Sequence, residues 1–173
     1  MKALADAEFR EYMAGRWPGL VRLAYGLTGD QALAEDLAQT ALAKAYASWS
    51  RVRRADDPDA YVRKIVVNAN LSRFRSRRVS EHLVAALPDR GAPDLTAQRD
   101  DRSALMAALM TLPPGQRAVV VLRYWVDLTE SQVAATLGCS VGNVRSQASR
   151  ALAKLRLSPE LAVSPDTNGR DAS

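Results

Sequence analysis

Apolar residues recur every three or four positions along most of this chain, which is the spacing of one buried face of an α-helix. Residues 118–122 are rich in β-branched side chains and could form a buried strand, but the flanking pattern is helical and no partner strand is found. The predicted fold class is therefore all-α. The pattern predicts helices over residues 5–14, 18–29, 31–49, 58–74 and beyond, 97–110, 114–126, 129–137 and 141–155.

A break in this pattern divides the chain into two small helical domains. Residues 87–93 (LPDRGAP) contain two prolines and a glycine, which is typical of a linker or an exposed loop. Pro159 and the polar residues after it indicate a frayed tail. The expected boundaries are residues 1–79 and 99–157 for the two domains, 80–98 for a flexible linker and 158–173 for the tail.

The second domain carries the pattern of a helix-turn-helix. Thr129 and Gln132 fit a capping box, with a hydroxyl at the N-cap and a glutamine three positions later. Gly138 can adopt the left-handed conformation that ends a helix, and Ser140 is a natural N-cap for the next helix. A generic helical hairpin is the alternative interpretation. The coincidence of a short helix, a glycine turn and a second N-cap favours DNA binding.

The helix after Ser140 has two distinct faces. Val144, Ala148, Ala151, Leu152 and Leu155 form one buried face. The opposite face carries no acid, and a helix of this kind fits the major groove, where side chains near its N-terminus contact base edges. The candidate DNA-binding residues are Ser140, Asn143, Arg145, Ser146, Ser149, Arg150 and Lys154.

The distribution of charge supports a polyanionic partner. The net charge is +5, but residues 51–80 carry nine basic and three acidic residues, and residues 141–156 carry four basic residues and no acid. Residues 81–101 lie between them and carry five acidic and two basic residues. Each lysine or arginine on a phosphate releases counterions, so two basic segments suit a nucleic acid. A pair of solvated helix faces is the alternative.

Composition excludes several classes of protein. With 173 residues, 47% hydrophobic and 25% charged, the chain has globular proportions. No apolar run approaches the roughly 20 residues of a membrane span, and no signal peptide is visible. We therefore expect a soluble, cytoplasmic protein. The single cysteine (Cys139) and single histidine (His82) exclude an internal disulfide, a cysteine zinc site and most hydrolytic triads, so no metal or cofactor is expected.

Two helices of the first domain carry candidate binding faces. On the helix over 31–49, a narrow polar strip with small neighbours suits the docking of another helix, although it could equally be a solvated face. Its residues are Asp36, Gln39, Thr40 and Ala43. On the helix from residue 58, cations and amides interleave with Val67, Leu71 and Phe74, as in a site for single-stranded nucleic acid. Packing against other helices is an equally weighted explanation for Leu71 and Phe74.

These stretches together resemble the bacterial sigma factors of the sigma-70 family. Residues 34–45 (AEDLAQTALAKA) resemble region 2.2, and residues 61–68 (YVRKIVVN) with the following arginines resemble regions 2.3 and 2.4. The segments LPPGQR and LRYW, followed by the helix-turn-helix, resemble region 4. The resemblance covers residues 9–156 and is greatest to the extracytoplasmic-function (ECF) sigma factors, in their SigE-like actinobacterial group.

The resemblance implies a non-catalytic specificity subunit of RNA polymerase. Region 2, in residues 1–79, would dock on the β′ clamp helices of core RNA polymerase through the polar strip and would recognise and melt the −10 element. Region 4, in residues 99–157, would bind the β flap and recognise the −35 element of promoter DNA. An anti-sigma factor is a further partner that the resemblance allows. The residues implied for the −10 element are Arg53, Arg54, Arg63, Asn68, Asn70, Arg73 and Arg75.

Two rival functions remain open on the sequence alone. A stand-alone helix-turn-helix regulator, with a dimerisation or sensor domain in the first half, would bind a duplex palindrome tightly without polymerase. An enzyme acting on nucleic acid would need a catalytic set, and none is found. Asp56, Asp57 and Asp59 lie in one short loop, where capping of the next helix is favoured over metal binding.

Overall fold

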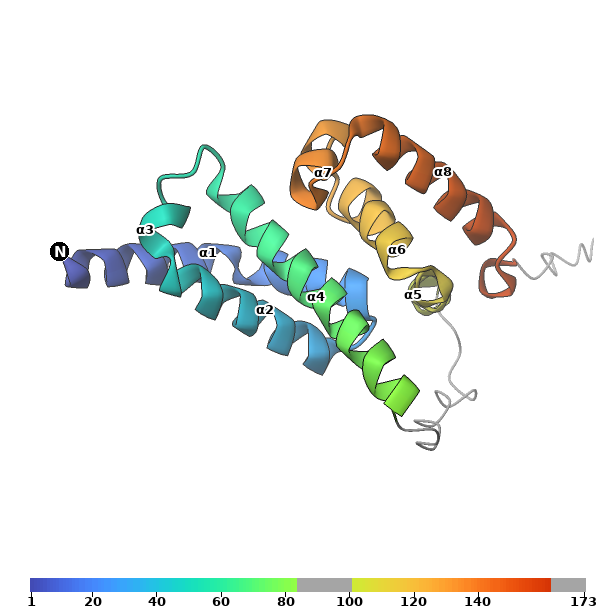
Figure 1. The fold of residues 1–173 in the computed structure, drawn as a ribbon, viewed down its shortest axis with the longest axis horizontal. Coiled ribbons are helices and arrows are strands. Elements are labelled where there is room, and N and C mark those ends of the chain that lie inside the picture. Colours follow the sequence, from blue (N-terminus) through green and yellow to red (C-terminus); the bar gives the residue numbers. More distant parts are fainter. Residues whose placement is uncertain (84–100, 163–173) are drawn as a thin grey trace, which may run out of the picture.

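A computed structural model describes residues 1–83 and 101–162, and all of its regular elements are helical (Figure 1). The predicted all-α class is therefore confirmed for these residues. The expected linker and the tail after residue 162 lie mainly outside the described residues. The elements are α1 (Lys2–Thr28), α2 (Gln31–Ala47), α3 (Trp49–Val52), α4 (Pro58–Leu83), α5 (Asp101–Thr111), α6 (Pro114–Val120), the π-helical η1 (Val121–Trp125), α7 (Glu130–Leu137), α8 (Val141–Arg156) and the 3₁₀-helical η2 (Pro159–Leu161).

The first module, which we define as residues 1–83, is built on the pairing of α1 with α2. Gly29 ends α1 with a φ of 68°, and Asp30 caps α2 by accepting a hydrogen bond from the Leu33 amide at 2.9 Å. The buried face of α2 is rich in alanine, which lets the two helix backbones approach closely. Helix α4 then packs across α2 and α1 through Val62 and Val66, both fully buried.

Helix α1 corrects one prediction. The sequence predicts two helices over residues 5–14 and 18–29, whereas the structure has a single helix with Pro18 inside it. A proline lacks one backbone donor and disfavours a helix interior. Here its side chain is exposed, and a continuous buried face that includes Phe9, Leu20 and Leu27 packs against the rest of the module. Tertiary packing therefore outweighs the local preference of Pro18.

The second module, which we define as residues 101–162, folds around α6 and α8. The predicted helix over 114–126 is α-helical only to Val120 and continues as one π-helical turn. The Val126 amide accordingly donates to the Val121 carbonyl, five residues back, at 2.9 Å. The extra residue in this turn allows Val121 to stay in the core while Trp125 points toward the first module.

The two modules pack directly against each other (Figure 1). Helix α4 lies against α6 and α7, and the C-terminal half of α1 lies against η1, α5 and α6. In residues 1–83 and 101–162, no helix is both long and apolar enough to cross a membrane.

Candidate nucleic-acid interface

The helix-turn-helix forms with the caps that the sequence predicts. The Thr129 hydroxyl accepts a hydrogen bond from the Gln132 amide at 3.2 Å, and the Gln132 side-chain oxygen accepts one from the Thr129 amide at 2.9 Å. Gly138 ends α7 with a φ of 67°, a conformation that glycine adopts without steric cost. The Ser140 hydroxyl then accepts from the Asn143 amide at 3.0 Å and starts α8. Local hydrogen bonds thus define where α7 and α8 begin.

The outer face of α8 is open to solvent. Val144, Ala151 and Leu155 anchor the opposite face in the core of the second module. All seven residues predicted to contact DNA here are exposed: Ser140, Asn143, Arg145, Ser146, Ser149, Arg150 and Lys154. The face therefore offers guanidinium, ammonium, amide and hydroxyl donors with small residues between them, which is the chemistry that reads base edges and phosphates.

One acid beside this face was not expected from the sequence. The Arg145 Nε donates to the Glu130 carboxylate at 2.5 Å, and Glu130 lies in the first turn of α7. The pair is 15 residues apart in sequence and both side chains are substantially exposed. Because the pair crosses the turn, helical spacing within α8 could not reveal it. Glu130 engages only the Nε of Arg145, so the Nη donors of the guanidinium can still reach a phosphate or a base edge.

The structure divides the seven predicted −10 residues between two environments. Asn68 and Arg75 are exposed on the outward side of α4. Arg53 and Arg54 are exposed before α4, where Arg53 pairs with Glu8 at 3.0 Å. The other three, Arg63, Asn70 and Arg73, are buried or half-buried, and Asn70 is only 1% exposed.

Phe74, in the C-terminal half of α4, contacts two arginine side chains. The guanidinium carbons of Arg73 and Arg117 lie 5.1 and 5.3 Å from the centre of its ring. Arg117 belongs to α6, so Phe74 packs across the boundary between the two modules. This contact supports the packing explanation for Phe74. Burial lowers the pKa of Arg73, and the neighbouring charge of Arg77 lowers it further.

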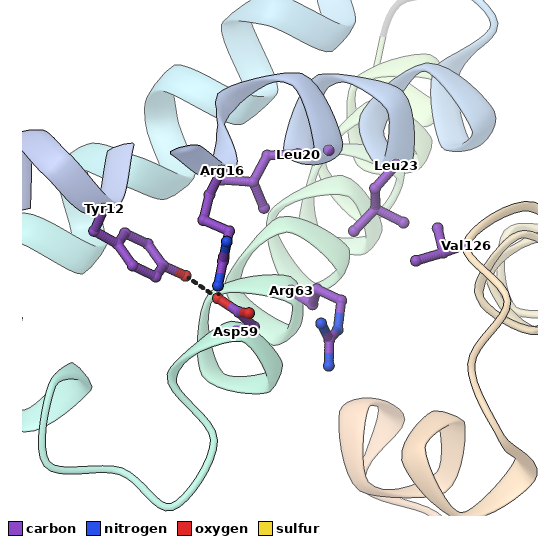
Figure 2. A pocket seen from close by; sticks show the side chains of 8 residues that line it. Tyr12, Arg16, Leu20, Leu23, Asp59, Arg63 and Val126 are labelled. Atoms are coloured by element: carbon purple, nitrogen blue, oxygen red, sulfur yellow. Dashed lines mark hydrogen bonds and ion pairs between the residues drawn. The ribbon is translucent and has the colours of Figure 1, made fainter. Parts of the chain in front are cut away.

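A polar cluster anchors the start of α4 to α1 (Figure 2). One oxygen of Asp59 accepts hydrogen bonds from the Tyr12 hydroxyl at 2.9 Å and from the Arg16 Nε at 2.8 Å. Partial burial raises the pKa of Asp59, but the hydrogen bonds from Arg16 and Tyr12 and the charges of Arg16 and Arg63 outweigh it, so the net pKa lies below its usual value. The cluster borders a cavity of about 120 Å³ that Val126 of the second module also lines.

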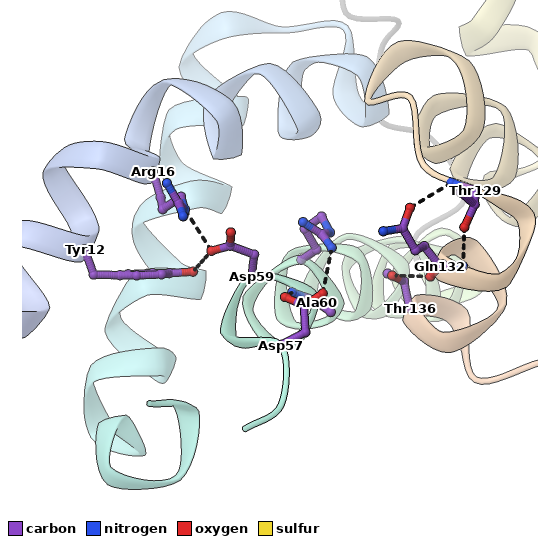
Figure 3. Close-up of polar contacts among 9 residues, drawn as sticks. Tyr12, Arg16, Asp57, Asp59, Ala60, Thr129, Gln132 and Thr136 are labelled. Carbon is purple, nitrogen blue, oxygen red and sulfur yellow. Dashed lines mark hydrogen bonds and ion pairs between the residues drawn. The ribbon is translucent and has the colours of Figure 1, made fainter. Parts of the chain in front are cut away.

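The neighbouring acid, Asp57, caps α4 as the sequence suggests. Its carboxylate accepts a hydrogen bond from the Ala60 amide at 2.9 Å and lies 3.6 Å from the Arg63 guanidinium (Figure 3). Within residues 1–83 and 101–162, no group of three histidine, cysteine or acidic side chains is placed to hold a metal ion. The long-range bonds of Asp59 to α1 were missed because no local pattern encodes a contact across more than 40 residues.

The polar strip of α2 lies on the side facing away from the core. Its opposite face is buried through Leu37, Ala38 and Ala41, among others. All four residues predicted for docking are exposed and near one another on the helix: Asp36, Gln39, Thr40 and Ala43. The structure therefore leaves this narrow polar strip of α2 open to solvent.

Comparison with known proteins places both modules in one family. Residues 17–79 match the family Sigma-70 region 2, and residues 102–155 match Sigma-70, region 4. The RNA polymerase sigma-E factor of Streptomyces coelicolor is 42% identical over 149 residues, which cover 86% of this chain and 84% of that protein. The ECF RNA polymerase sigma factor SigL of Mycobacterium tuberculosis is 31% identical over 160 residues, covering 90% and 88%.

Solved structures show the same fold. The sigma factor RpoE of Bartonella quintana, solved in complex with the anti-sigma factor NepR, superposes with a TM-score of 0.72 at 24% identity, covering 87% of this chain and 95% of that one. CnrH, solved in complex with the cytosolic domain of CnrY, gives a TM-score of 0.62 at 24% identity, covering 90% and 92%. With both regions matched and a sigma-E factor aligned over most of its length, the chain belongs to the extracytoplasmic-function sigma factors of the sigma-70 family, in their sigma-E-like group.

Proposed function

We propose that this chain binds core RNA polymerase and directs promoter-specific initiation, with α8 reading the −35 element and the first module recognising and melting the −10 element. One observation carries the proposal: a capped helix-turn-helix presents the outer face of α8 to solvent in a chain that matches both sigma-70 regions. The first module, which such a chain needs for −10 recognition, exposes Arg53 and Arg54 before α4 and Arg75 on the outward side of α4.

For the −35 element, α8 enters the major groove with its exposed outer face. Asn143 and Arg150 are exposed and have the amide and guanidinium groups that pair with adenine and guanine edges. Lys154 lies near the other end of the helix, where an ammonium group suits a phosphate. A single helix with few base contacts gives modest affinity by itself.

For the −10 element, the first module captures unpaired bases of one strand. Unpairing and unstacking cost a few kcal/mol per base, and stacking and hydrogen bonding in the protein offset this cost. Arg53, Arg54 and Arg75 supply charge for the backbone, and Asn68 supplies an exposed amide for base edges. The polymerase holds both DNA contacts at a fixed spacing, so the second contact gains from effective concentration.

The protein partners follow from two exposed surfaces. The polar strip of α2 docks on the β′ clamp helices, and the second module binds the β flap. The structurally similar RpoE and CnrH are each bound to another protein, NepR and the cytosolic domain of CnrY, and we extend an anti-sigma partner to this chain on that basis. The chain contributes specificity, and the polymerase performs catalysis.

Run-off transcription tests the proposal. Purified core polymerase is incubated with genomic fragments, with and without the protein, and transcript start sites are mapped. We expect discrete start sites that depend on the protein and share sequence elements near −35 and −10. The absence of any protein-dependent start would overturn the proposal. Tight binding to a duplex palindrome without polymerase would instead support the stand-alone regulator.

A further inference from the structure

We propose that Glu130 is a positioning residue for sequence reading by α8, which holds Arg145 so that its guanidinium contacts a base edge rather than a phosphate. This inference rests on the proposed function, because it concerns how α8 reads the −35 element. It gives an acidic residue of α7, outside the helix that enters the groove, a part in DNA specificity. An ion pair, the hollow around it and the chemistry of DNA carry the inference.

The ion pair joins the start of α7 to the second turn of α8. The Arg145 Nε donates to one carboxylate oxygen of Glu130 at 2.5 Å. Glu130 is the first residue of α7, and Arg145 lies four residues after Val141, the first residue of α8. In a helix-turn-helix, the residues near the N-terminus of the second helix contact base edges. Arg145 therefore lies where α8 is expected to read the sequence.

The contact occupies one part of the guanidinium and leaves the rest available. An arginine has five N–H donors in a planar fork, one on Nε and four on the two Nη atoms. Glu130 accepts from the Nε donor. The side chain of Arg145 is 69% exposed, so the Nη end of the fork stays accessible. Guanine presents two acceptors, O6 and N7, on its major-groove edge, and a pair of N–H groups matches them.

The carboxylate changes which DNA group the guanidinium favours. An unpaired arginine is attracted to every phosphate, because this attraction depends on net charge and not on sequence. The pair of Glu130 and Arg145 has no net charge but keeps its Nη donors. A phosphate beside the pair is repelled by the carboxylate, whereas the edge of a guanine carries no net charge to be repelled. The pair therefore favours a base edge over the backbone.

A hollow beside α8 shows why Arg145 needs such a contact. Its volume is about 260 Å³, and among the described residues that line it Glu130 is the only acid. Because the hollow leaves open space next to Arg145, packing does not fix the conformation of this long side chain, and the bond to Glu130 does. A side chain that is ordered before binding loses less entropy on binding. The lining residues are Tyr124, Glu130, Arg145, Ala148, Ser149, Leu152 and Arg156.

A purely structural role for Glu130 is the alternative. An acid in the first turn of a helix interacts favourably with the helix dipole. However, Thr129 and Gln132 already form the capping box of α7. The ion pair itself is exposed, with 69% and 36% of the two side chains open to solvent, and exposed pairs contribute little to stability. The two roles predict different results, because only positioning affects base preference.

Three substitutions separate geometry from charge. Glu130→Gln keeps a side-chain oxygen that can accept from the Arg145 Nε but removes the negative charge. Glu130→Ala removes both. Asp127→Asn is the matched control, because Asp127 is an exposed acid three residues before Glu130. Its φ of 60° is a conformation that asparagine adopts readily, so this control leaves the turn intact.

Base preference is measured with the complex of core polymerase and full-length protein, on a promoter library randomised in the −35 element. We expect Arg145→Ala to reduce the preference at one base pair about tenfold. Glu130→Ala should reduce the preference at the same base pair about threefold or more, while Glu130→Gln retains most of it. Asp127→Asn should match the wild type. In the Arg145→Ala background, Glu130→Ala should have no further effect on this preference.

The salt dependence of affinity gives an independent measurement. The full-length protein without polymerase is titrated against a duplex that lacks promoter elements, at several salt concentrations. Without the carboxylate, Arg145 is free to contact a phosphate. We therefore expect the slope of log affinity against log salt to become steeper by about 0.9 in Glu130→Ala and Glu130→Gln. Asp127→Asn should change the slope less, because it releases no arginine.

The outcomes separate this inference from the proposed function. An unchanged −35 preference in Glu130→Ala would overturn the positioning role, and a loss of stability alone in urea denaturation would support the helix-dipole role in its place. A further loss of preference when Glu130→Ala is added to Arg145→Ala would show that Glu130 does not act through Arg145, which also overturns the inference. The absence of any −35 preference in the wild type would reject the proposed function itself, before any variant is compared.

Discussion

Arg117 satisfies four backbone carbonyls with one buried side chain, three in its own module and one in α1. Replacement by methionine keeps most of the side-chain volume but leaves these carbonyls without donors. We expect Arg117→Met to lower the free energy of unfolding by about 3 kcal/mol, because hydrogen bonds to a charged group are strong and buried acceptors are costly to leave unpaired. Arg123→Met is the control, since Arg123 donates to one carbonyl, that of Leu128.

Urea denaturation measures the free energy of unfolding of Arg117→Met, Arg123→Met and the wild type. A loss in Arg117→Met no larger than that in Arg123→Met would contradict the special role of Arg117. The sequence shows the LPPGQR motif but gives no sign that its arginine is buried. That property depends on the Leu27 carbonyl, 90 residues away.

Arg150 is exposed on the outer face of α8 and is a candidate for direct base reading. If it pairs with a guanine, Arg150→Ala should weaken binding of the polymerase–sigma complex to its promoter by about 1–3 kcal/mol and relax the preference at one base pair of the −35 element. Run-off transcription on a promoter library measures both effects. Arg10→Ala changes an exposed arginine on α1 and should alter neither. An unchanged base preference in Arg150→Ala would reject the assignment.

We expect Asp59 to make the stability of the protein depend on pH. Its carboxylate accepts hydrogen bonds from Tyr12 and Arg16, and its pKa in the folded protein lies below the usual value of about 3.9. A carboxyl group whose pKa is lower in the folded protein stabilises the fold when the pH is above its pKa in the unfolded chain. This stabilisation disappears as the pH falls through its pKa in the folded protein. We therefore expect Asp59→Asn to be less stable than the wild type near pH 7 and the gap to narrow below about pH 4.

Urea unfolding at several pH values measures this gap. Asp56→Asn is the matched control, because Asp56 is an exposed acid in the same loop. A gap between wild type and Asp59→Asn that stays constant from neutral to acidic pH would show that the hydrogen-bonded carboxylate does not stabilise the fold.

Elements with a local signature are the ones that the sequence predicts well. The caps at Thr129, Gly138 and Ser140 are all found as expected, because each depends on residues within three or four positions. The continuity of α1 through Pro18 was missed because it depends on packing against α2. The π-helical turn after Val120 was missed for a similar reason. Its last residue, Trp125, donates a hydrogen bond to the Arg22 carbonyl of α1, and this contact between modules is not encoded by the local sequence.

The capping box of α7 gives a prediction for this element. Thr129→Ala removes the acceptor for the Gln132 amide, and we expect it to lower the free energy of unfolding by about 1 kcal/mol. Ser131→Ala removes an exposed hydroxyl from the same helix and should cost less. Equal losses in the two variants, measured by urea denaturation, would mean that the cap contributes nothing beyond helix propensity.

At the scale of the whole molecule, the sequence predicts two helical modules but not their packing. The bonds that join the modules connect residues 90 and 103 positions apart, and no periodicity encodes such pairs. The exposed face of α8 could be predicted because it depends on one amphipathic helix, although the Glu130 contact across the turn could not. The burial of Asn70 could not be predicted, because it depends on how other helices pack against α4.

The exposed strip of α2 gives a prediction for assembly. Asp36 is exposed on α2, so Asp36→Ala should leave the helix content unchanged while reducing co-purification with core polymerase. Glu11→Ala removes an exposed acid from α1 and should bind like the wild type. Circular dichroism and pull-down with purified core polymerase measure the two properties. Equal recovery of Asp36→Ala and wild type would remove the strip as the docking surface.

The unbroken course of α1 has a geometric consequence. Glu8, near the start of α1, forms an ion pair with Arg53, and Arg16, in the middle of the helix, forms one with Asp59. The last turn of α1 accepts a hydrogen bond from Arg117. A helix of 27 residues is about 40 Å long and rotates by 100° with each residue. The loop before α4 and the second module therefore both attach to one continuous helix. The number of residues between their attachment sites on α1 sets the distance between the sites and the rotation of one site relative to the other about the helix axis.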